Sequence, residues 1–223
     1  MAASPPAFER EYYDTYYRDY DRQNPPRKMR HYRETVERCL LPGSSARILD
    51  IGCAFGAFLA ALDTRWQPYG MDVSEYAVGQ ARSRLPRAHL EVVRDGVIPF
   101  REPFDVITAW DVIEHIPELD SVAAQVCQHL TASGAFVFVV PVYDGPLGPL
   151  VNALDRDTTH IHRMARDFWL HWAGRHFQLE GWWGIFRFLF PGGHYLHWPT
   201  RALRRVAPAI AVVARRKSDE RAE

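Results

Sequence analysis

Short apolar runs alternate with amphipathic stretches through the middle of the chain. Five runs have strand length and are rich in β-branched and aromatic residues: 47–53, 69–73, 90–93, 104–110 and 135–140. Helical patterns lie between them, over 57–62, 74–85 and 118–130. Strands that alternate with helices form a parallel sheet covered on both faces, so this region predicts a doubly wound α/β domain.

The N-terminal part of the chain has a helical pattern that is unusually rich in tyrosine. It runs over residues 8–41 and is interrupted at Pro25-Pro26. Four tyrosines recur at helical spacing and are expected to form one stripe: Tyr13, Tyr16, Tyr17 and Tyr20. We therefore assign 1–41 to an N-terminal helical cap, which either packs on the domain or covers its substrate.

Tryptophan and histidine become frequent after Pro141. The pattern predicts a helix over 166–175, an aromatic strand-like run over 177–190 and a last strand over 209–214. We assign 42–223 to the α/β domain, with an aromatic-rich cap inserted at 142–208.

The composition excludes several classes of protein. The 223 residues include 27 basic and 27 acidic side chains, with 47% hydrophobic and 24% charged residues, which is typical of a folded domain. A balanced charge gives no overall attraction to nucleic acid. We find neither a signal peptide nor an apolar run of spanning length, and three cysteines without a C-x-x-C pair indicate reduced thiols. We therefore expect a cytoplasmic protein without stable membrane insertion.

A glycine-bearing turn follows the first predicted strand and reads DIGCAFG over 50–56. Glycine allows a positive φ and a close approach of backbone to ligand. The spacing is neither the dinucleotide G-x-G-x-x-G nor a P-loop. Asp50 places a carboxylate beside the turn, which would repel a pyrophosphate and attract a cation. Asp72 ends the next strand, where a carboxylate can accept the hydroxyls of a ribose.

These residues resemble the motifs of class I S-adenosylmethionine-dependent methyltransferases, over about 47–140. DIGCAFG is similar to D-x-G-x-G-x-G, with Ala54 in place of the middle glycine. RDGVIPF (94–100) is similar to G-D-x-x-x-L-P-F, and FDVITAWDVIEHIP (104–117) to the segment after the fourth strand of small-molecule and quinone methyltransferases. The resemblance implies a Rossmann-like, seven-stranded sheet of the methyltransferase type, with S-adenosyl-L-methionine as cofactor and S-adenosyl-L-homocysteine as product.

The resemblance also implies which residues hold the cofactor. The turn would hold the methionine part, through Asp50, Gly52, Cys53, Ala54 and Gly56. The ends of the following strands would hold the nucleoside, through Asp72 at the ribose and Val73, Asp95, Gly96 and Trp110 around the rest.

Methyl transfer is an in-line displacement, so the protein positions the acceptor and removes its proton where one exists. Histidine is the natural base near neutral pH, and we predict His160 and His115 as catalytic residues. His160 lies in a segment similar to a D-x-T-H motif of related enzymes. His115 ends DVIEH, which resembles an E-x-x-E-H block linked to a divalent metal in quinone O-methyltransferases. Structural roles for both histidines, and the presence of a metal, stay open.

Four residues are candidates for substrate contacts: Tyr143 and Asp144 after the fifth predicted strand, His162 in the run that follows, and Tyr16 on the tyrosine-rich N-terminal segment. The aromatic segment at 186–198 could cover the acceptor, form a homodimer contact, rest on a membrane surface or pack as an ordinary hairpin. These alternatives stay open.

The sequence therefore predicts a methyltransferase that acts on oxygen or nitrogen of a small organic acceptor. The aromatic cap favours an aromatic or amphipathic molecule, as in secondary metabolism. The alternatives are a membrane-surface quinone-type methyltransferase and a non-catalytic cofactor-binding partner protein. The glycine-bearing turn at 50–56 disfavours a nicotinamide-dependent oxidoreductase, because it lacks the G-x-G-x-x-G spacing and carries Asp50.

Overall fold

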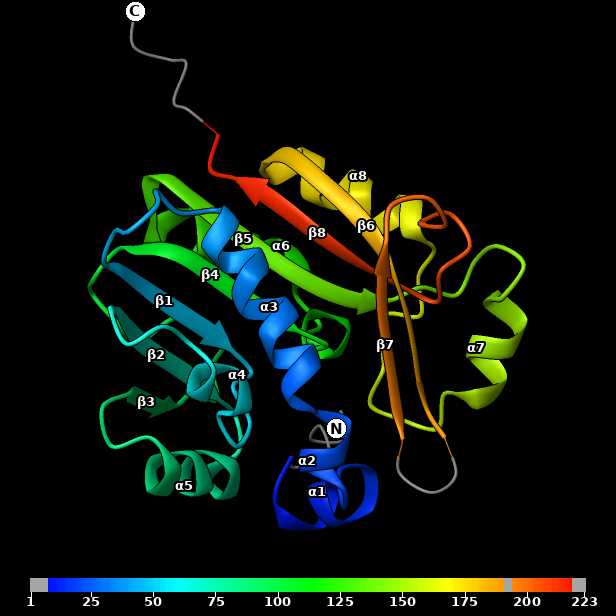
Figure 1. The fold of residues 1–223 in the computed structure, drawn as a ribbon, viewed down its shortest axis with the longest axis horizontal. Helices are drawn as coiled ribbons and strands as arrows, with labels where there is room; N and C mark the ends of the chain where they lie inside the picture. Colours follow the sequence, from blue (N-terminus) through cyan, green and yellow to red (C-terminus); the bar gives the residue numbers. More distant parts are fainter. Residues whose placement is uncertain (1–7, 191–193, 218–223) are drawn as a thin grey trace, which may run out of the picture.

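A computed structural model describes residues 8–190 and 194–217. Its strands form one sheet in the order β3-β2-β1-β4-β5-β8-β6-β7, and helices cover both faces (Figure 1). The strands are β1 (Ala46–Ile51), β2 (Trp66–Asp72), β3 (His89–Val92), β4 (Phe104–Trp110), β5 (Leu130–Pro141), β6 (Gln178–Leu189), β7 (Tyr195–Thr200) and β8 (Ala209–Arg215). The helices are α1 (Arg10–Tyr16), α2 (Tyr20–Gln23), α3 (Pro26–Arg38), α4 (Ala57–Ala60), α5 (Glu75–Arg84), α6 (Leu119–His129), α7 (Gly148–Leu154) and α8 (Arg166–His176).

The predicted doubly wound sheet is confirmed. Strands β3, β2, β1, β4 and β5 are parallel, and β8 joins β5 in the antiparallel direction. The sheet has one strand more than the predicted seven, because β6 continues past β8 and pairs with β7 as a hairpin. The carboxyl ends of the parallel strands meet at one edge, where α/β sheets bind ligands.

Two layers of apolar side chains pack against the sheet, one on each face. On one face α3, α4 and α5 contribute buried residues such as Val36, Phe58 and Val78. On the other face α6 and α8 contribute Val126, Trp169 and Trp172. Both faces of the central strands are therefore buried, which explains why their sequences are apolar runs rather than alternating ones.

The N-terminal region differs from the expected single tyrosine stripe. A turn between Tyr16 and Tyr20 separates α1 from α2, so the chain forms three short helices before β1. The physical reason is visible at Phe55, whose ring lies 4.7 Å from that of Tyr13 and 4.6 Å from that of Tyr20. The turn brings both tyrosines onto the same side chain of the glycine-bearing turn, which one continuous helix would not do. Helix α7, inside the 142–208 cap, was also not predicted.

Candidate functional site

The turn after β1 has the backbone that its glycines predict. Gly52 and Gly56 have φ of 71° and 77°, and Ala54 has a φ of 46°, which costs free energy for a residue with a Cβ. The carboxylate of Asp72 accepts hydrogen bonds from the backbone N–H groups of Ala54 and Ser74, each at 2.9 Å. This carboxylate therefore ties the turn to the end of β2.

Gly52 is also required by its neighbour in space. A Cβ at this position would lie 2.4 Å from the side chain of Val112. We expect Gly52→Ala to lower the free energy of unfolding by about 2 kcal/mol, which corresponds to an unfolding midpoint about 4–8 °C lower for a chain of this size. Thermal unfolding followed by circular dichroism measures this change in the midpoint.

Gly79 in α5 provides the matched control, because a Cβ there meets nothing within 4 Å. Gly79→Ala should leave the midpoint unchanged or raise it. The double variant Gly52→Ala with Val112→Ala should recover part of the loss. An unchanged midpoint for Gly52→Ala would contradict the close contact.

Two buried carboxylates lie at this edge of the sheet. Asp50 is 2% exposed and accepts a hydrogen bond from Thr108 Oγ1 at 2.7 Å, and Asp72 is 8% exposed. Burial, opposed by the bond from Thr108 and reinforced by nearby Asp72, raises the pKa of Asp50 to about 8. Burial also raises the pKa of Asp72. A cationic ligand would offset this cost, whereas an anionic one would increase it.

Beyond Asp72, the strand edge presents apolar side chains to solvent. Val73 is 44% exposed and Val97 is 48% exposed. Asp95 accepts a hydrogen bond from the backbone N–H of Val97, and Gly96, with a φ of 73°, leaves open space on its side of the turn. These residues can flank a flat apolar group such as a nucleobase.

The N-terminal helices cover this edge. Besides the tyrosines on Phe55, the carboxylate of Glu9 accepts hydrogen bonds from the backbone N–H groups of Glu75 and Tyr76, at the start of α5. Tyr16, a predicted substrate contact, pairs its hydroxyl with that of Thr158 at 3.3 Å. Helix α1 therefore bridges the turn and the 157–160 segment.

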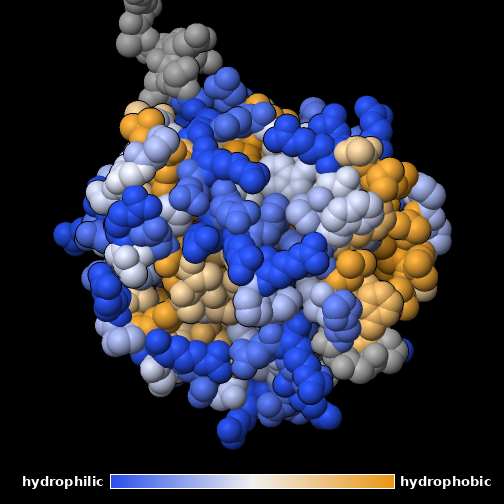
Figure 2. All heavy atoms as spheres, viewed as in Figure 1, coloured by the Kyte–Doolittle hydropathy of each residue, from blue (hydrophilic) through white to orange (hydrophobic). Residues whose placement is uncertain are grey.

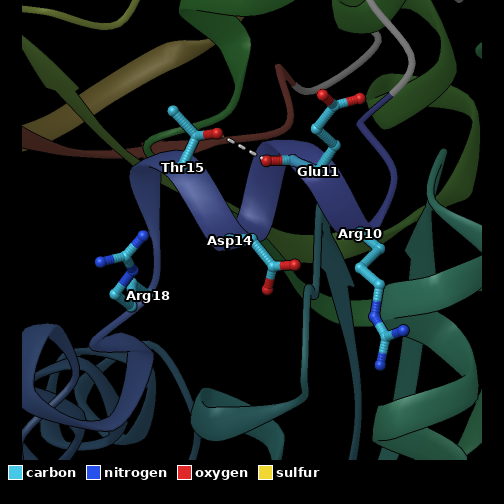
Figure 3. Close-up of a pocket in the computed structure, with 5 residues that line it drawn as sticks. All are labelled: Arg10, Glu11, Asp14, Thr15 and Arg18. Carbon is cyan, nitrogen blue, oxygen red and sulfur yellow. Dashed lines mark hydrogen bonds between the residues drawn. The ribbon is translucent and has the colours of Figure 1, made fainter.

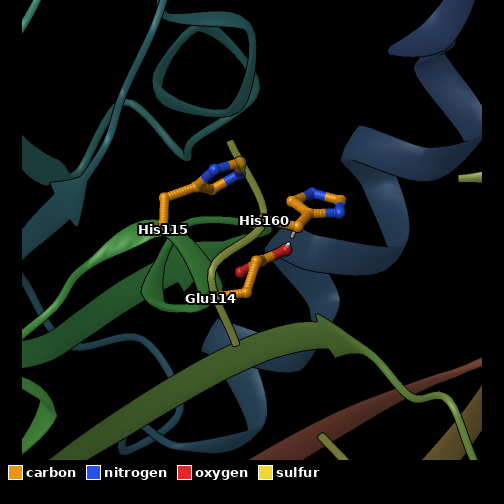
Figure 4. Close-up of side chains that lie close together, drawn as sticks. All are labelled: Glu114, His115 and His160. Atoms are coloured by element: carbon orange, nitrogen blue, oxygen red, sulfur yellow. Dashed lines mark ion pairs between the residues drawn. The ribbon is translucent and has the colours of Figure 1, made fainter. Parts of the chain in front are cut away.

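The two predicted catalytic histidines lie together. The rings of His115 and His160 have centroids 4.6 Å apart, and the carboxylate of Glu114 is directed at His160, with 3.9 Å between Oε1 and Nε2 (Figure 4). Glu114 and His115 belong to a short 3₁₀ turn, Ile113–His115, after β4, whereas His160 comes from the cap. One ligand atom from each of the three side chains lies within 4.8 Å of the others.

A carboxylate orients His160. Asp155 Oδ2 accepts hydrogen bonds from His160 Nδ1 at 2.8 Å and from the hydroxyl of Tyr143 at 2.5 Å. Although burial acts to raise it, these two bonds hold the pKa of Asp155 below its usual value. Because an ionised carboxylate only accepts, we assign the proton to Nδ1, which leaves the lone pair on Nε2.

Burial shifts the pKa of each of the other two members of the cluster toward its neutral form. Burial, with His160 nearby, lowers the pKa of His115 to about 4, and its Nδ1 bonds to the carbonyl and hydroxyl oxygens of Thr159. Glu114 is fully buried; burial and then the charge of Asp111 raise its pKa well above the usual value. Neither carboxyl oxygen of Glu114 has a hydrogen-bond partner in the described part of the chain.

The remaining predicted residues have other neighbours. Asp144 accepts hydrogen bonds from the backbone N–H and Nε of Arg166, which attaches it to α8. His162 Nε2 lies 2.9 Å from the carbonyl oxygen of Ile116 and so anchors the cap to the segment after β4. Cys53 is 3% exposed beneath the turn.

Trp110 ends β4 and lies flat against Tyr32 of α3, with ring centroids 3.9 Å apart and an angle of 6° between the planes. The next residue, Asp111, has a φ of 58° and binds Arg187 of β6 through both of its carboxylate oxygens. Burial acts to raise the pKa of Asp111, but the charges of Arg187 and Lys28, together with the hydrogen bonds from Arg187, hold it below its usual value. This ion pair joins the hairpin to the end of β4.

Three contributors to the site were missed by sequence reasoning. They are Asp155, which orients His160; Arg187, which binds Asp111; and Tyr12, whose hydroxyl donates to Asp157 at 2.9 Å. Asp155 lies five positions before His160, and only this spacing could have drawn attention to it. Arg187 and Tyr12 come from distant parts of the chain, so no local pattern indicates them.

The chain is similar in sequence to known methyltransferases. A family model described as a methyltransferase domain matches residues 20–207. A ubiquinone biosynthesis O-methyltransferase of Azoarcus sp. (strain BH72) is 30% identical over 107 residues, 45% of this chain and 45% of the relative. Another from Hahella chejuensis is 29% identical over 117 residues, 49% and 48% of the two chains. The chain therefore spans about half the length of the curated relatives it matches.

Solved structures share its fold. Magnesium protoporphyrin IX methyltransferase of Synechocystis PCC 6803, with bound SAH, superposes with a TM-score of 0.67 at 13% identity, over 96% of this chain and 98% of that one. A SAM-dependent methyltransferase of Thermotoga maritima superposes with a TM-score of 0.64 at 13% identity, over 93% and 99%. Among the described residues, no helix is long and apolar enough to cross a membrane.

Proposed function

Because this chain belongs to the methyltransferase domain family, we propose that it transfers a methyl group from S-adenosylmethionine to an oxygen or nitrogen of a small organic acceptor in the cytoplasm. The observation that supports the proposal most directly is the pair of buried carboxylates, Asp50 and Asp72, on either side of a glycine-bearing turn. They favour a ligand that carries positive charge and ribose hydroxyls together.

The residues at this edge fit that cofactor. The turn at 52–56 brings backbone close to the ligand, Asp50 lies beneath it, and Asp72 retains lone pairs for ribose hydroxyls beside the two backbone groups that it already binds. The exposed side chains of Val73 and Val97 would pack on the adenine. The bound cofactor supplies an electrophilic methyl group on a sulfonium.

His160 is the proposed general base. Its Nδ1–H is held by Asp155, so Nε2 has a fixed direction and a free lone pair for the acceptor proton. Tyr143 supports the same carboxylate, and Tyr12 and Phe8 of the N-terminal region close the space beside the histidines. Covering the site in this way excludes water from the acceptor.

Calorimetry with the purified protein tests the cofactor. S-adenosylhomocysteine should release or absorb heat on binding, whereas NAD should not. Binding of NAD alone would overturn the assignment. The same purified protein tests the non-catalytic alternative. A cofactor-binding partner protein would bind S-adenosylhomocysteine but transfer no labelled methyl group to any acceptor.

A second candidate is metal-assisted O-methylation of a quinone-type acceptor, supported by the closeness of Glu114, His115 and His160. Two imidazoles and a carboxyl group that can ionise on binding a cation are a suitable donor set for a divalent ion. On this candidate, chelator-treated protein should bind a single equivalent of Zn²⁺, and Glu114→Gln should weaken that binding by tenfold or more. Turnover that is unchanged in excess EDTA would exclude the metal-assisted candidate and leave the proposal in which His160 acts as general base.

The quinone candidate also predicts a membrane-surface enzyme. A liposome flotation assay in which no protein floats would exclude that role. Analytical ultracentrifugation tests the proposed homodimer.

A further inference from the structure

The N-terminal segment 8–23, which contains α1 and α2, has a polar face and an aromatic face. The polar face of α1 lines a shallow hollow of about 450 Å³ (Figure 3), through Arg10, Glu11, Asp14, Thr15 and Arg18. All five residues are exposed, and Figure 2 shows hydrophilic residues over this part of the surface, at the lower centre of the view. The other face is buried or half-buried and carries Tyr12, Tyr13, Tyr16 and Tyr17. The aromatic face of α1 is therefore turned into the protein.

Tyr13, on this aromatic face, lies over the glycine-bearing turn and beside the end of β2. It is 6% exposed, and its ring is stacked on that of Phe55, with an angle of 28° between the planes. Burial, and then the charge of Asp72, raises the pKa of the Tyr13 hydroxyl. Tyr13 is therefore a neighbour of the carboxylate to which the proposed function assigns the ribose.

Tyr20, at the start of α2, lies over the other carboxylate. Its ring packs on Phe55 at 4.6 Å, as described above. Burial raises the pKa of Tyr20, the backbone N–H group of Ala57 acts to lower it by a hydrogen bond, and the charge of Asp50 acts to raise it. The hydroxyl of Tyr20 is therefore directed at the turn and at Asp50, where the proposed function places the methionine part of the cofactor.

The two tyrosines cover only one end of the proposed cofactor site. Asp50 and Asp72 are buried beneath them, whereas Val73 and Val97, at the adenine end, are exposed. Ligand sites have volumes of about 300–1,000 Å³. Two hollows of this size lie elsewhere on the described residues, one on the outer side of α1 and one of about 390 Å³ between the hairpin and the start of α3, and neither borders the turn. The methionine and ribose end is therefore closed by side chains of the protein itself.

Contacts on both sides fix the backbone of α1 in this position. On one side, Glu9 accepts hydrogen bonds from the backbone N–H groups of Glu75 and Tyr76, at 3.2 and 3.1 Å. On the other side, the hydroxyl of Tyr12 donates to Asp157 at 2.9 Å. Because these contacts do not involve the turn, the two tyrosine side chains over it can move while α1 stays above the histidines.

We propose that Tyr13 and Tyr20 form an autoinhibitory contact: they occupy part of the cofactor's place, and the cofactor has to displace them in order to bind. The inference rests on the proposed function, because it takes Asp50 and Asp72 as the cofactor site. The apparent affinity for the cofactor is then the intrinsic affinity multiplied by the fraction of molecules in which the tyrosines have left the turn. Substitutions that weaken the contact should therefore tighten cofactor binding.

The two tyrosines obstruct different parts of the cofactor, so two probes distinguish them. Adenosine has the ribose but lacks the methionine part, whereas S-adenosylhomocysteine has both. Tyr13→Ala should tighten the binding of both probes, because Tyr13 lies at Asp72. Tyr20→Ala should tighten the binding of S-adenosylhomocysteine and leave that of adenosine unchanged. Each gain should be about two- to tenfold, the range expected for loss of one aromatic contact.

Isothermal titration calorimetry with the whole chain measures both affinities, and circular dichroism shows whether each variant is folded. Tyr20→Phe provides a milder change, because it keeps the ring on Phe55 and removes only the hydroxyl at the turn. It should also tighten the binding of S-adenosylhomocysteine. Asp14→Ala is the control, because Asp14 is exposed on the outer face of α1, and both affinities should stay unchanged.

The sign of the change decides the inference. Weaker binding of S-adenosylhomocysteine by folded Tyr20→Ala and Tyr20→Phe would overturn it and identify Tyr20 as a cofactor contact. Unchanged affinities in all the tyrosine variants would overturn it as well, and either result leaves the proposed function intact. Absence of S-adenosylhomocysteine binding by the unaltered protein and by every variant would remove the proposed function and the inference together. Binding by Tyr20→Ala but not by the unaltered protein would support both.

Discussion

Replacement of Asp72 by alanine should weaken the binding of S-adenosylhomocysteine by about 100-fold or more, because two hydrogen bonds to a charged acceptor are lost together. The change also removes the acceptor for the backbone N–H groups of Ala54 and Ser74, so the turn loses its tie to β2. Isothermal titration calorimetry measures the affinity directly and needs no knowledge of the acceptor.

Controls separate lost contacts from lost structure. Asp72→Asn keeps the size of the side chain but not its charge, and should weaken binding nearly as much. Asp167→Ala removes an exposed carboxylate from the first turn of α8 and should leave binding unchanged. Circular dichroism at the titration temperature must show each variant folded. Affinity within threefold of the original for a folded Asp72→Ala protein would contradict the assignment of the ribose site.

Replacement of His160 by alanine should lower kcat by about 10²–10⁴-fold, the range expected for loss of a positioned general base. Binding of S-adenosylhomocysteine should be unchanged, because the proposed cofactor residues lie on β1, β2 and β4 and in the segments after β1, β2 and β3, while His160 belongs to the cap. Asp155→Asn should lower kcat as well, since an amide can donate to His160 Nδ1 and stabilise the wrong tautomer.

The measurement begins with a screen of acceptors against a labelled methyl donor, after which kcat and KM are compared for the variants. Asp155 acts through His160, so Asp155→Asn should lower kcat and leave KM unchanged. His171→Ala is the control, because this histidine is exposed on α8. Full turnover of His160→Ala would remove it as the base and favour an acceptor that carries no proton to lose.

The α/β core was predictable because its signals are local. The central parallel strands are apolar runs. In the turn after β1, Gly52 and Gly56 indicate the positions where φ is positive. Asp50 and Asp72 follow from the same logic, since both end strands whose carboxyl ends meet at one edge. Ser74 was also read correctly as the start of α5, where its hydroxyl accepts from the backbone N–H of Ala77.

The cap was less predictable because long-range contacts decide it. The pairing of Arg187 with Asp111 spans 76 positions, and Tyr12 reaches Asp157 across 145. Helix α7 begins within a run of glycines and prolines, at 145–149, that predicts a loop. Strand β7 was expected only under the hairpin alternative for 186–198, because its neighbour β6, and not its own pattern, determines that it is a strand. The catalytic and substrate assignments in the cap therefore stay predictions, while the fold and the family are confirmed.

The ion pair between Asp111 and Arg187 has a consequence for how such chains diverge. A carboxylate held at a φ of 58° after β4 depends on a guanidinium from a hairpin far along the chain. Loss of either partner alone leaves a partly buried charge without its counterpart. The two positions should therefore vary together among relatives, and a hairpin exchanged between relatives should function only when residue 111 is exchanged with it. We therefore expect the hairpin and the turn after β4 to change together in evolution.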